Sequence, residues 1–208
     1  EPGHGNSFVF GSSGTTIRML TPSWIHPSGS YCVGGSFDEE GVCRGGEVWA
    51  SGRIDSPQPT MNHCMDRERQ ELVLLKQGGQ NIEVIDVGMQ GPDASSYLRV
   101  SQRLTLPPSL AVSQSYAGPC TVLPTSGHVV VSSIEQQAVA VVERGEDPTV
   151  VRKNLLPFRT GSMAVFEDRL VIAEATGNRF SLLDSESLEP TFEHRFTRPI
   201  GAMAVDQS

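Results

Sequence analysis

The hydrophobic pattern of the chain is clearest between residues 169 and 196. Arg169–Glu174 reads RLVIAE and places two apolar side chains on each face, as in a strand buried between neighbouring sheets. A turn containing Gly and Asn follows, and then Arg179–Asp184 predicts a second strand. Thr191–Phe196 alternates Phe and His with polar residues. Short strands separated by a few turn residues predict an antiparallel sheet at this place.

Similar alternation recurs through most of the chain. It predicts further strands at Ser7–Phe10, Thr15–Leu20, Glu47–Ile54, Glu71–Lys76, Asn81–Val87, Tyr97–Leu106, Gly127–Ser133, Ala138–Glu143 and Val150–Leu155. The first two form a hairpin in this interpretation. Asp55–Cys64 contains two prolines and is interpreted as a linker. No long amphipathic helix is visible, so the fold class is all-β.

A short motif repeats towards the end of the chain. Gly161–Val165 and Gly201–Val205 match in shape, and Met163 and Met203 are 40 residues apart. A repeat of this length is typical of β-propeller blades. We therefore expect about four blades, each of about four antiparallel strands. Their inner strands are expected to begin near Phe8, Leu72, Val129 and Leu170.

Two stretches exceed the length that a minimal blade needs. They are residues 21–46 and 88–118, and we interpret them as irregular inserted loops within a single domain spanning residues 1–208. Insertions in repeat proteins map to loops that often lie on a binding face. An unclosed set of blades would leave apolar faces open. We therefore expect the chain to be part of a longer propeller, or to be completed by a second chain.

The repeat resembles one named family. Gly161–Val165, Arg169–Glu174, Gly177–Arg179 and Leu182–Asp184 resemble the NHL-type repeat, or a related propeller repeat of the WD or YVTN kind. Glu174 stands where the NHL pattern usually has Asp. The resemblance implies a propeller fold. It also implies an alternative activity, because some NHL-like proteins are lyases or hydrolases with metal ligands on inner strands around a central channel.

Charge and hydropathy restrict the class of partner. The net charge is −8, whereas nucleic acids and anionic lipids require clustered Lys and Arg, so we expect no nucleic-acid partner. Ala138–Val142 is the longest clean apolar run and is far too short to span a bilayer. No Asn-x-Ser/Thr sequon occurs, which slightly favours an intracellular over a secreted protein and leaves the compartment open.

Candidate chemistry is sparse. Cys32 and Cys43 flank a Gly-rich acidic loop and could close it with a disulfide, or both could be free thiols. His26 with these cysteines, or His63 with Cys64, could meet at zinc, but the tight paired spacing of structural zinc sites is missing. The sequence thus predicts no metal, no cofactor and no catalytic residue.

The acidic residues that end strands have a structural interpretation. We expect Glu174, Asp184 and Asp206 to fix turns through hydrogen bonds to the backbone. Together these features favour a non-catalytic propeller module, a scaffold that binds other proteins within a larger assembly. The alternative is a propeller-type lyase or hydrolase with a metal in the central channel, for which His128 is the one histidine beside an expected inner strand.

Overall fold

The computed structural model describes residues 7–10, 16–22, 30–33, 35–40, 42–45, 47–55, 58–78, 81–87, 100–106, 117–133, 135–145, 149–167, 169–201 and 203. These residues form strands and turns, and none of the described ranges contains a helix. The all-β prediction is therefore confirmed. The chain divides into two compact units, Glu1–Pro59 and Thr60–Ser208, which we call unit 1 and unit 2. The single domain stays a prediction, and each unit is described by itself.

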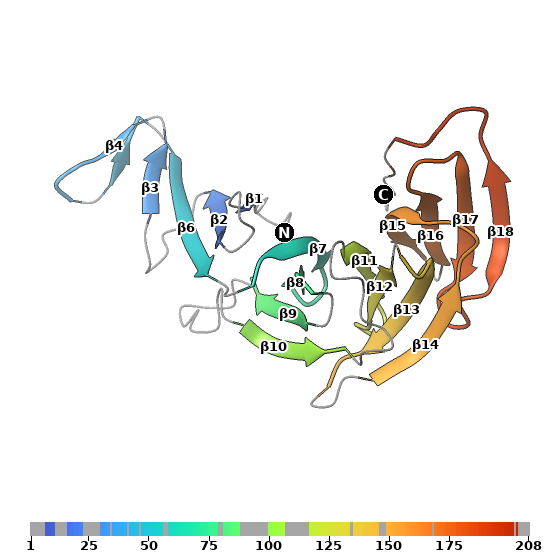
Figure 1. The fold of residues 1–208 in the computed structure, drawn as a ribbon. Helices are drawn as coiled ribbons and strands as arrows, with labels where there is room; N and C mark the ends of the chain where they lie inside the picture. The colour runs from blue at the N-terminus through green and yellow to red at the C-terminus, as the bar shows by residue number, and fades with distance from the viewer. Residues whose placement is uncertain are drawn as a thin grey trace. The chain divides into compact units, whose positions relative to one another are not determined.

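Unit 2 consists of three four-stranded antiparallel sheets (Figure 1). The C sheet comprises β7 (Thr60–Asp66), β8 (Glu71–Lys76), β9 (Asn81–Asp86) and β10 (Val100–Thr105). The D sheet comprises β11 (Ala117–Val122), β12 (Val129–Ser133), β13 (Ala138–Glu143) and β14 (Thr149–Leu155). The E sheet comprises β15 (Thr160–Phe166), β16 (Arg169–Glu174), β17 (Arg179–Asp184) and β18 (Pro190–Arg195). In each sheet the strands pair in chain order, which confirms the predicted four-stranded repeat.

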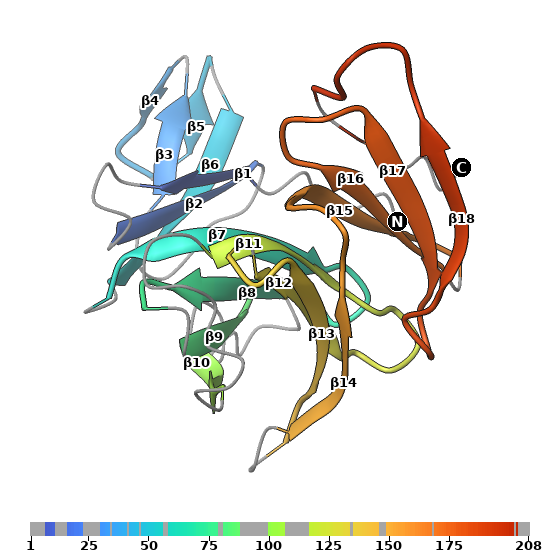
Figure 2. The same cartoon turned by 45° about the vertical axis from the view of Figure 1, so that its right-hand side comes forward.

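The first strands of the three sheets are neighbours, because β11 contacts both β7 and β15 (Figures 1 and 2). The strands that we expected to be innermost, near Leu72, Val129 and Leu170, are instead the second strands of their sheets. The true first strands lack a clean apolar signal. β7 lies largely inside the predicted linker and directly follows Pro59, and β11 contains the Gly-Pro dipeptide at 118–119.

Two aliphatic clusters hold the sheets of unit 2 together. The cluster between the C and D sheets contains Val73, Leu75, Ile82, Val84, Leu104, Leu106, Cys120, Val122, Val129, Val131, Ala140 and Val142. The cluster between the D and E sheets contains Val130, Val139, Val141, Leu156, Phe158, Val165, Leu170, Ile172, Leu183 and Leu188. The two faces of the D sheet therefore enter different cores, which explains why every residue of its second and third strands is buried except Glu143.

The C sheet also buries an ion pair. Lys76 is 1% exposed, and its Nζ lies 2.9 Å from Thr60 Oγ1 and 3.0 Å from Glu83 Oε2. Desolvation lowers the pKa of Lys76, while the hydrogen bond with Glu83 opposes that shift. Arg103 reaches the same carboxylate from the solvent side, with Nε 3.2 Å from Oε1. The network satisfies the polar groups that this face of the sheet buries.

Unit 1 has a different strand order. Its four-stranded sheet runs β1 (Ser7–Phe10), β2 (Thr16–Pro22), β6 (Glu47–Asp55) and β3 (Ser30–Val33). β4 (Ser36–Phe37) and β5 (Cys43–Arg44) form a small separate hairpin. The predicted hairpin at the start of the chain is confirmed as the β1–β2 pair. Because β6 lies between β2 and β3, this sheet does not follow chain order as the three sheets of unit 2 do.

One of the two predicted irregular loops, residues 21–46, is more regular than expected, because it contains β3, β4 and β5. The other, residues 88–118, contains β10, which lies within the strand predicted at Tyr97–Leu106. Residues 88–99 and 107–116 lie outside the described residues, so a binding role for them stays a prediction. None of the described residues belongs to a helix long and apolar enough to cross a membrane.

Candidate functional site

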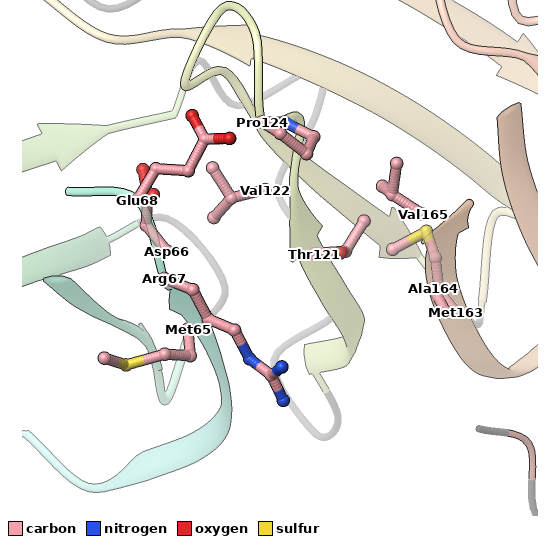
Figure 3. Close-up of a pocket in the computed structure, with 10 residues that line it drawn as sticks. All are labelled: Met65, Asp66, Arg67, Glu68, Thr121, Val122, Pro124, Met163, Ala164 and Val165. Atoms are coloured by element: carbon pink, nitrogen blue, oxygen red, sulfur yellow. The ribbon is translucent and has the colours of Figure 1, made fainter. Parts of the chain in front are cut away.

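A pocket of about 240 Å³ lies where the three first strands of unit 2 end (Figure 3). It is lined by Met65, Asp66, Arg67, Glu68, Thr121, Val122, Pro124, Met163, Ala164 and Val165. These residues come from the end of β7 and its turn, the end of β11 and its turn, and β15. Its lining combines apolar side chains with polar groups, and its charged side chains come from the last residue of β7 and from the β7–β8 turn.

Local backbone irregularities position these strands. Each first strand has a register shift near its start, between residues 60 and 62, 117 and 120, and 160 and 162. A β-carbon at Gly161 would lie 2.4 Å from Ala175 Cα, and one at Gly118 would lie 2.3 Å from Ser132 Oγ. Glycine at these positions lets the backbones approach closely. Gly161 is the first residue of the repeated sequence motif. The glycine of the motif is therefore explained by the close approach of β15 to the backbone at Ala175.

An ion network fixes the wall between the C and D sheets. Asp66 is 2% exposed, and its Oδ2 accepts hydrogen bonds from Arg69 Nη1 at 3.2 Å and Arg144 Nη1 at 3.3 Å. Its Oδ1 accepts one from Arg69 N at 3.0 Å. Arg144 also binds Glu71, and Arg69 Nη1 donates to the Pro124 carbonyl at 3.2 Å. Asp66 is thereby neutralised by two guanidinium groups, and its role in the pocket is structural.

Arg67 and Glu68 are the two charged residues of the pocket that take no part in the Asp66 network. Both are exposed, and neither has a hydrogen bond or an ion pair within the part of the chain that the structure describes. Figure 3 shows that their charged groups project from the same turn in opposite directions. They therefore remain available to a ligand, whereas the neighbouring Asp66 does not.

A disulfide between Cys64 and Cys120 joins β7 to β11, with a Cα–Cα distance of 5.6 Å, and each cysteine directly precedes a residue that lines the pocket. The sequence interpretation missed this pair, because 56 residues separate the two cysteines and no spacing motif connects them. The zinc alternative for Cys64 is wrong, since its sulfur is already bonded. Among the described residues, no group of three His, Cys, Asp or Glu side chains could hold a metal ion.

The predicted disulfide of unit 1 is described only in part. Cys43 is disulfide-bonded, so the free-thiol alternative is wrong for this residue. The side chain of Cys32 lies outside the described residues, although its backbone pairs with Val48 in the sheet. The pairing of Cys32 with Cys43 stays a prediction. His26 also lies outside the described residues.

A second, larger groove of about 740 Å³ lies between the D and E sheets. Its polar lining includes His128, Arg152, Glu167, Asp184 and Glu186. His128, the histidine that the sequence singled out, therefore faces this groove and does not line the pocket of Figure 3.

The acidic residues at strand ends behave in two ways. Asp184 Oδ1 accepts hydrogen bonds from Ser187 N at 2.7 Å and Glu186 N at 3.0 Å. The bond from the Ser187 backbone is the main reason that the pKa of Asp184 lies below its usual value. The turn-fixing prediction is thus confirmed for Asp184. The Glu174 carboxylate lies against Gly177 and makes no such bond among the described residues, and Asp206 lies outside them.

Comparison with solved structures identifies the class of fold. Virginiamycin B lyase from Staphylococcus aureus, a β-propeller protein, matches with a TM-score of 0.58 and 15% identity over 94% of this chain and 54% of that chain. AztD from Citrobacter koseri matches with a TM-score of 0.53 and 11% identity, over 90% and 46% of the two chains. Hydrazine synthase from Kuenenia stuttgartiensis matches with a TM-score of 0.52 and 12% identity, over 70% and 38%.

These likenesses, together with the three meandering sheets, show a β-propeller-type fold. The chain spans about half the length, or less, of the solved structures it matches. No family model and no curated protein matches the sequence, so the NHL type in particular is not shown.

Proposed function

We propose that this chain is a non-catalytic propeller module that binds a protein partner at the pocket formed by β7, β11 and β15. The carrying observation is that the pocket combines apolar side chains, among them Met65 and Met163, with two exposed charged residues, Arg67 and Glu68, that have no partner within the described part of the chain. Fold alone does not decide function, because the same architecture hosts unrelated activities. The proposal therefore rests on the chemistry of the pocket.

The pocket fits a side chain of a peptide better than a whole small molecule. Its volume of about 240 Å³ is below the ~300–1,000 Å³ that is usual for ligand pockets. Met65 and Met163 offer flexible, polarisable surface that adapts to different apolar side chains. Charges of opposite sign at Arg67 and Glu68 can pair with a peptide that carries an acidic and a basic residue beside its apolar anchor.

The C–D wall of the pocket is rigid. The Cys64–Cys120 disulfide and the Asp66 network both connect the C and D sheets next to the pocket. The E sheet contributes its wall through packing around Val165. A rigid wall favours binding, because less conformational entropy is lost when the partner docks.

The test is to pan a display library of random short peptides against the purified chain and to measure the affinity of enriched peptides by calorimetry. We expect peptides with one large apolar residue next to charged residues. Arg67→Glu and Met163→Asp should each weaken binding about tenfold or more. Arg159→Glu is the matched control, because Arg159 is an exposed arginine that does not line the pocket, and it should bind as wild type does.

Two results would contradict the proposal. One is the absence of any enriched peptide, and the other is enriched peptides whose affinity is unchanged by both pocket variants. Metal analysis of the purified protein addresses the enzymatic alternative. Stoichiometric bound metal would favour a metal-dependent lyase or hydrolase over a binding module.

A further inference from the structure

Two arginines face each other across the last two strands of the E sheet (Figure 2). Register places Arg179, the first residue of β17, opposite Arg195, the last residue of β18. Directly opposite residues of neighbouring strands have their β-carbons about 5 Å apart on the same face, and like charges at such positions destabilise a sheet. The fold therefore gains nothing from this pair, whereas a bound anion would relieve the repulsion.

No carboxylate among the described residues neutralises the two arginines. The side chains of Arg179 and Arg195 have neither an ion pair nor a hydrogen bond there. Two glutamates belong to the same part of the sheet. Glu193 Oε1 accepts a hydrogen bond from Ser181 Oγ at 3.3 Å, and the carboxylate of Glu174 lies against the β16–β17 turn. Both guanidinium groups are therefore available to an anion from outside the chain.

The guanidinium group of Arg179 reaches back across the sheet towards the start of β15. Its Cζ lies 5.4 Å from the centre of the Phe158 ring, and Phe158 comes shortly before Thr160, the first residue of β15. The face of an aromatic ring attracts a cation. Phe158 is buried in the cluster between the D and E sheets, so its ring holds the guanidinium group at the edge of that cluster.

Two buried polar atoms in this part of the E sheet have no hydrogen-bond partner. They are Nε of Arg179 and Oγ1 of Thr160, and no other buried side-chain nitrogen or oxygen among the described residues is left without one. Thr160 is 0% exposed and pairs in register with Glu174, which precedes the β16–β17 turn that Arg179 follows. Buried polar groups are nearly always hydrogen-bonded. The two unpartnered atoms therefore point to a ligand.

We propose that Thr160, Arg179 and Arg195 form a binding site for a phosphate group. Guanidinium N–H groups form a fork that matches the oxygens of phosphate, and the Thr160 hydroxyl supplies a further donor. Arg198 adds a third positive charge, because its segment is hydrogen-bonded to the β16–β17 turn. A phosphate group carries a charge of about −1.5 to −2 at pH 7, which suits several arginines better than the single charge of a carboxylate.

The phosphate site is separate from the pocket of Figure 3, because none of its residues lines that pocket. An NMR titration of the isotope-labelled chain with inorganic phosphate, at an ionic strength held constant with sodium chloride, tests the proposal. Phosphate should shift the amide signals around Thr160, Arg179 and Arg195 in a saturable manner. Acetate should bind about tenfold more weakly, since it has fewer acceptor oxygens and less charge. O-phosphoserine in place of phosphate distinguishes a phosphate group on an organic molecule from the free anion.

Arg195→Gln should weaken phosphate binding about tenfold or more, because it removes charge-assisted hydrogen bonds. It should not lower the melting temperature, since it also removes a like-charge contact. Thr160→Val keeps the shape of the side chain and removes its hydroxyl. This change should weaken phosphate binding without destabilising the fold, because the hydroxyl has no partner within the chain to lose.

Arg152→Gln is the matched control, because Arg152 is an exposed arginine on β14 that lines the second groove. It should bind phosphate as wild type does. The proposal is overturned by a wild-type chain whose signals respond to phosphate no more than to chloride. It is also overturned if Arg195→Gln and Thr160→Val both leave the affinity unchanged, if Arg152→Gln weakens binding as much as Arg195→Gln, or if acetate binds as tightly as phosphate. The peptide-binding test at the pocket is independent of these outcomes.

Discussion

Removal of the Cys64–Cys120 disulfide should destabilise unit 2 strongly. The cross-link closes a loop with a sequence separation of 56 residues that contains three strands of the C sheet. On the chain-entropy estimate, closing a loop of this length in the unfolded state is worth about 4 kcal/mol at 25 °C. Cys120 is also buried among valines of the D sheet. Replacing both cysteines by alanine leaves a small void that adds about 1 kcal/mol.

The assay is urea denaturation of the Cys64→Ala/Cys120→Ala variant beside wild type, followed by circular dichroism. The free energy of unfolding should fall by about 5 kcal/mol, and the melting temperature should fall by about 10–20 °C. Wild type measured with a reducing agent should lose most of the same stability. A change below about 1 kcal/mol would refute the reasoning, because it would show that the cross-link does not restrict the unfolded chain.

Three further outcomes follow from the described contacts. Arg144→Ala should cost about 2 kcal/mol in urea denaturation, since it removes one of two guanidinium partners of the buried Asp66; an unchanged midpoint would contradict this. The folded-state pKa of Asp184 is lowered, so its stabilisation exists above the unfolded pKa and is lost as pH falls through the folded pKa. The stability difference between wild type and Asp184→Ala should therefore shrink below pH 3.8. Mass spectrometry of the unreduced, digested protein should recover Cys32 and Cys43 in one linked peptide.

Strands whose two faces are both apolar could be predicted from sequence. β8, β13, β16 and β17 have the same bounds as the strands that alternation predicted, and β18 is shifted from its predicted bounds by one residue. β7 could not be found, because its residues alternate between exposed and half-buried positions and only Asp66 at its end is buried. Its stability comes from pairing with β8 and from the disulfide, and neither contact leaves a local hydrophobic pattern.

The pocket could not be predicted from the sequence, for a related reason. Its residues come from turns and strand ends that are far apart in the chain, and only the sheet order brings Arg67, Thr121 and Met163 together. The repeated Gly161–Val165 motif was the one available signal, since it contains three of the lining residues. The motif identified β15 as a closely packed strand, but it could not indicate that residues of β7 and β11 line the same pocket.

The disulfide also bears on the compartment. Disulfides persist in oxidising environments and are rare in reducing ones. The Cys64–Cys120 bond therefore favours an oxidising location, whereas the missing sequon slightly favoured an intracellular one. Mass spectrometry of protein isolated without reductant distinguishes the two possibilities.

The strand order of unit 1 has a consequence for the speed of folding. Each sheet of unit 2 pairs strands that are adjacent in the chain, so its hairpins can form from local contacts. In unit 1 the pairing of β2 with β6 joins residues as distant as Thr16 and Asp55, which are 39 positions apart. β6 also pairs with β3 along its other edge, so the sheet is complete only when β6 has joined both strands. Non-local pairing slows folding, because the chain loses the entropy of closing a long loop before the stabilising contacts form. The sheets of unit 2 should therefore gain protection from hydrogen exchange earlier than β2 and β6 during refolding.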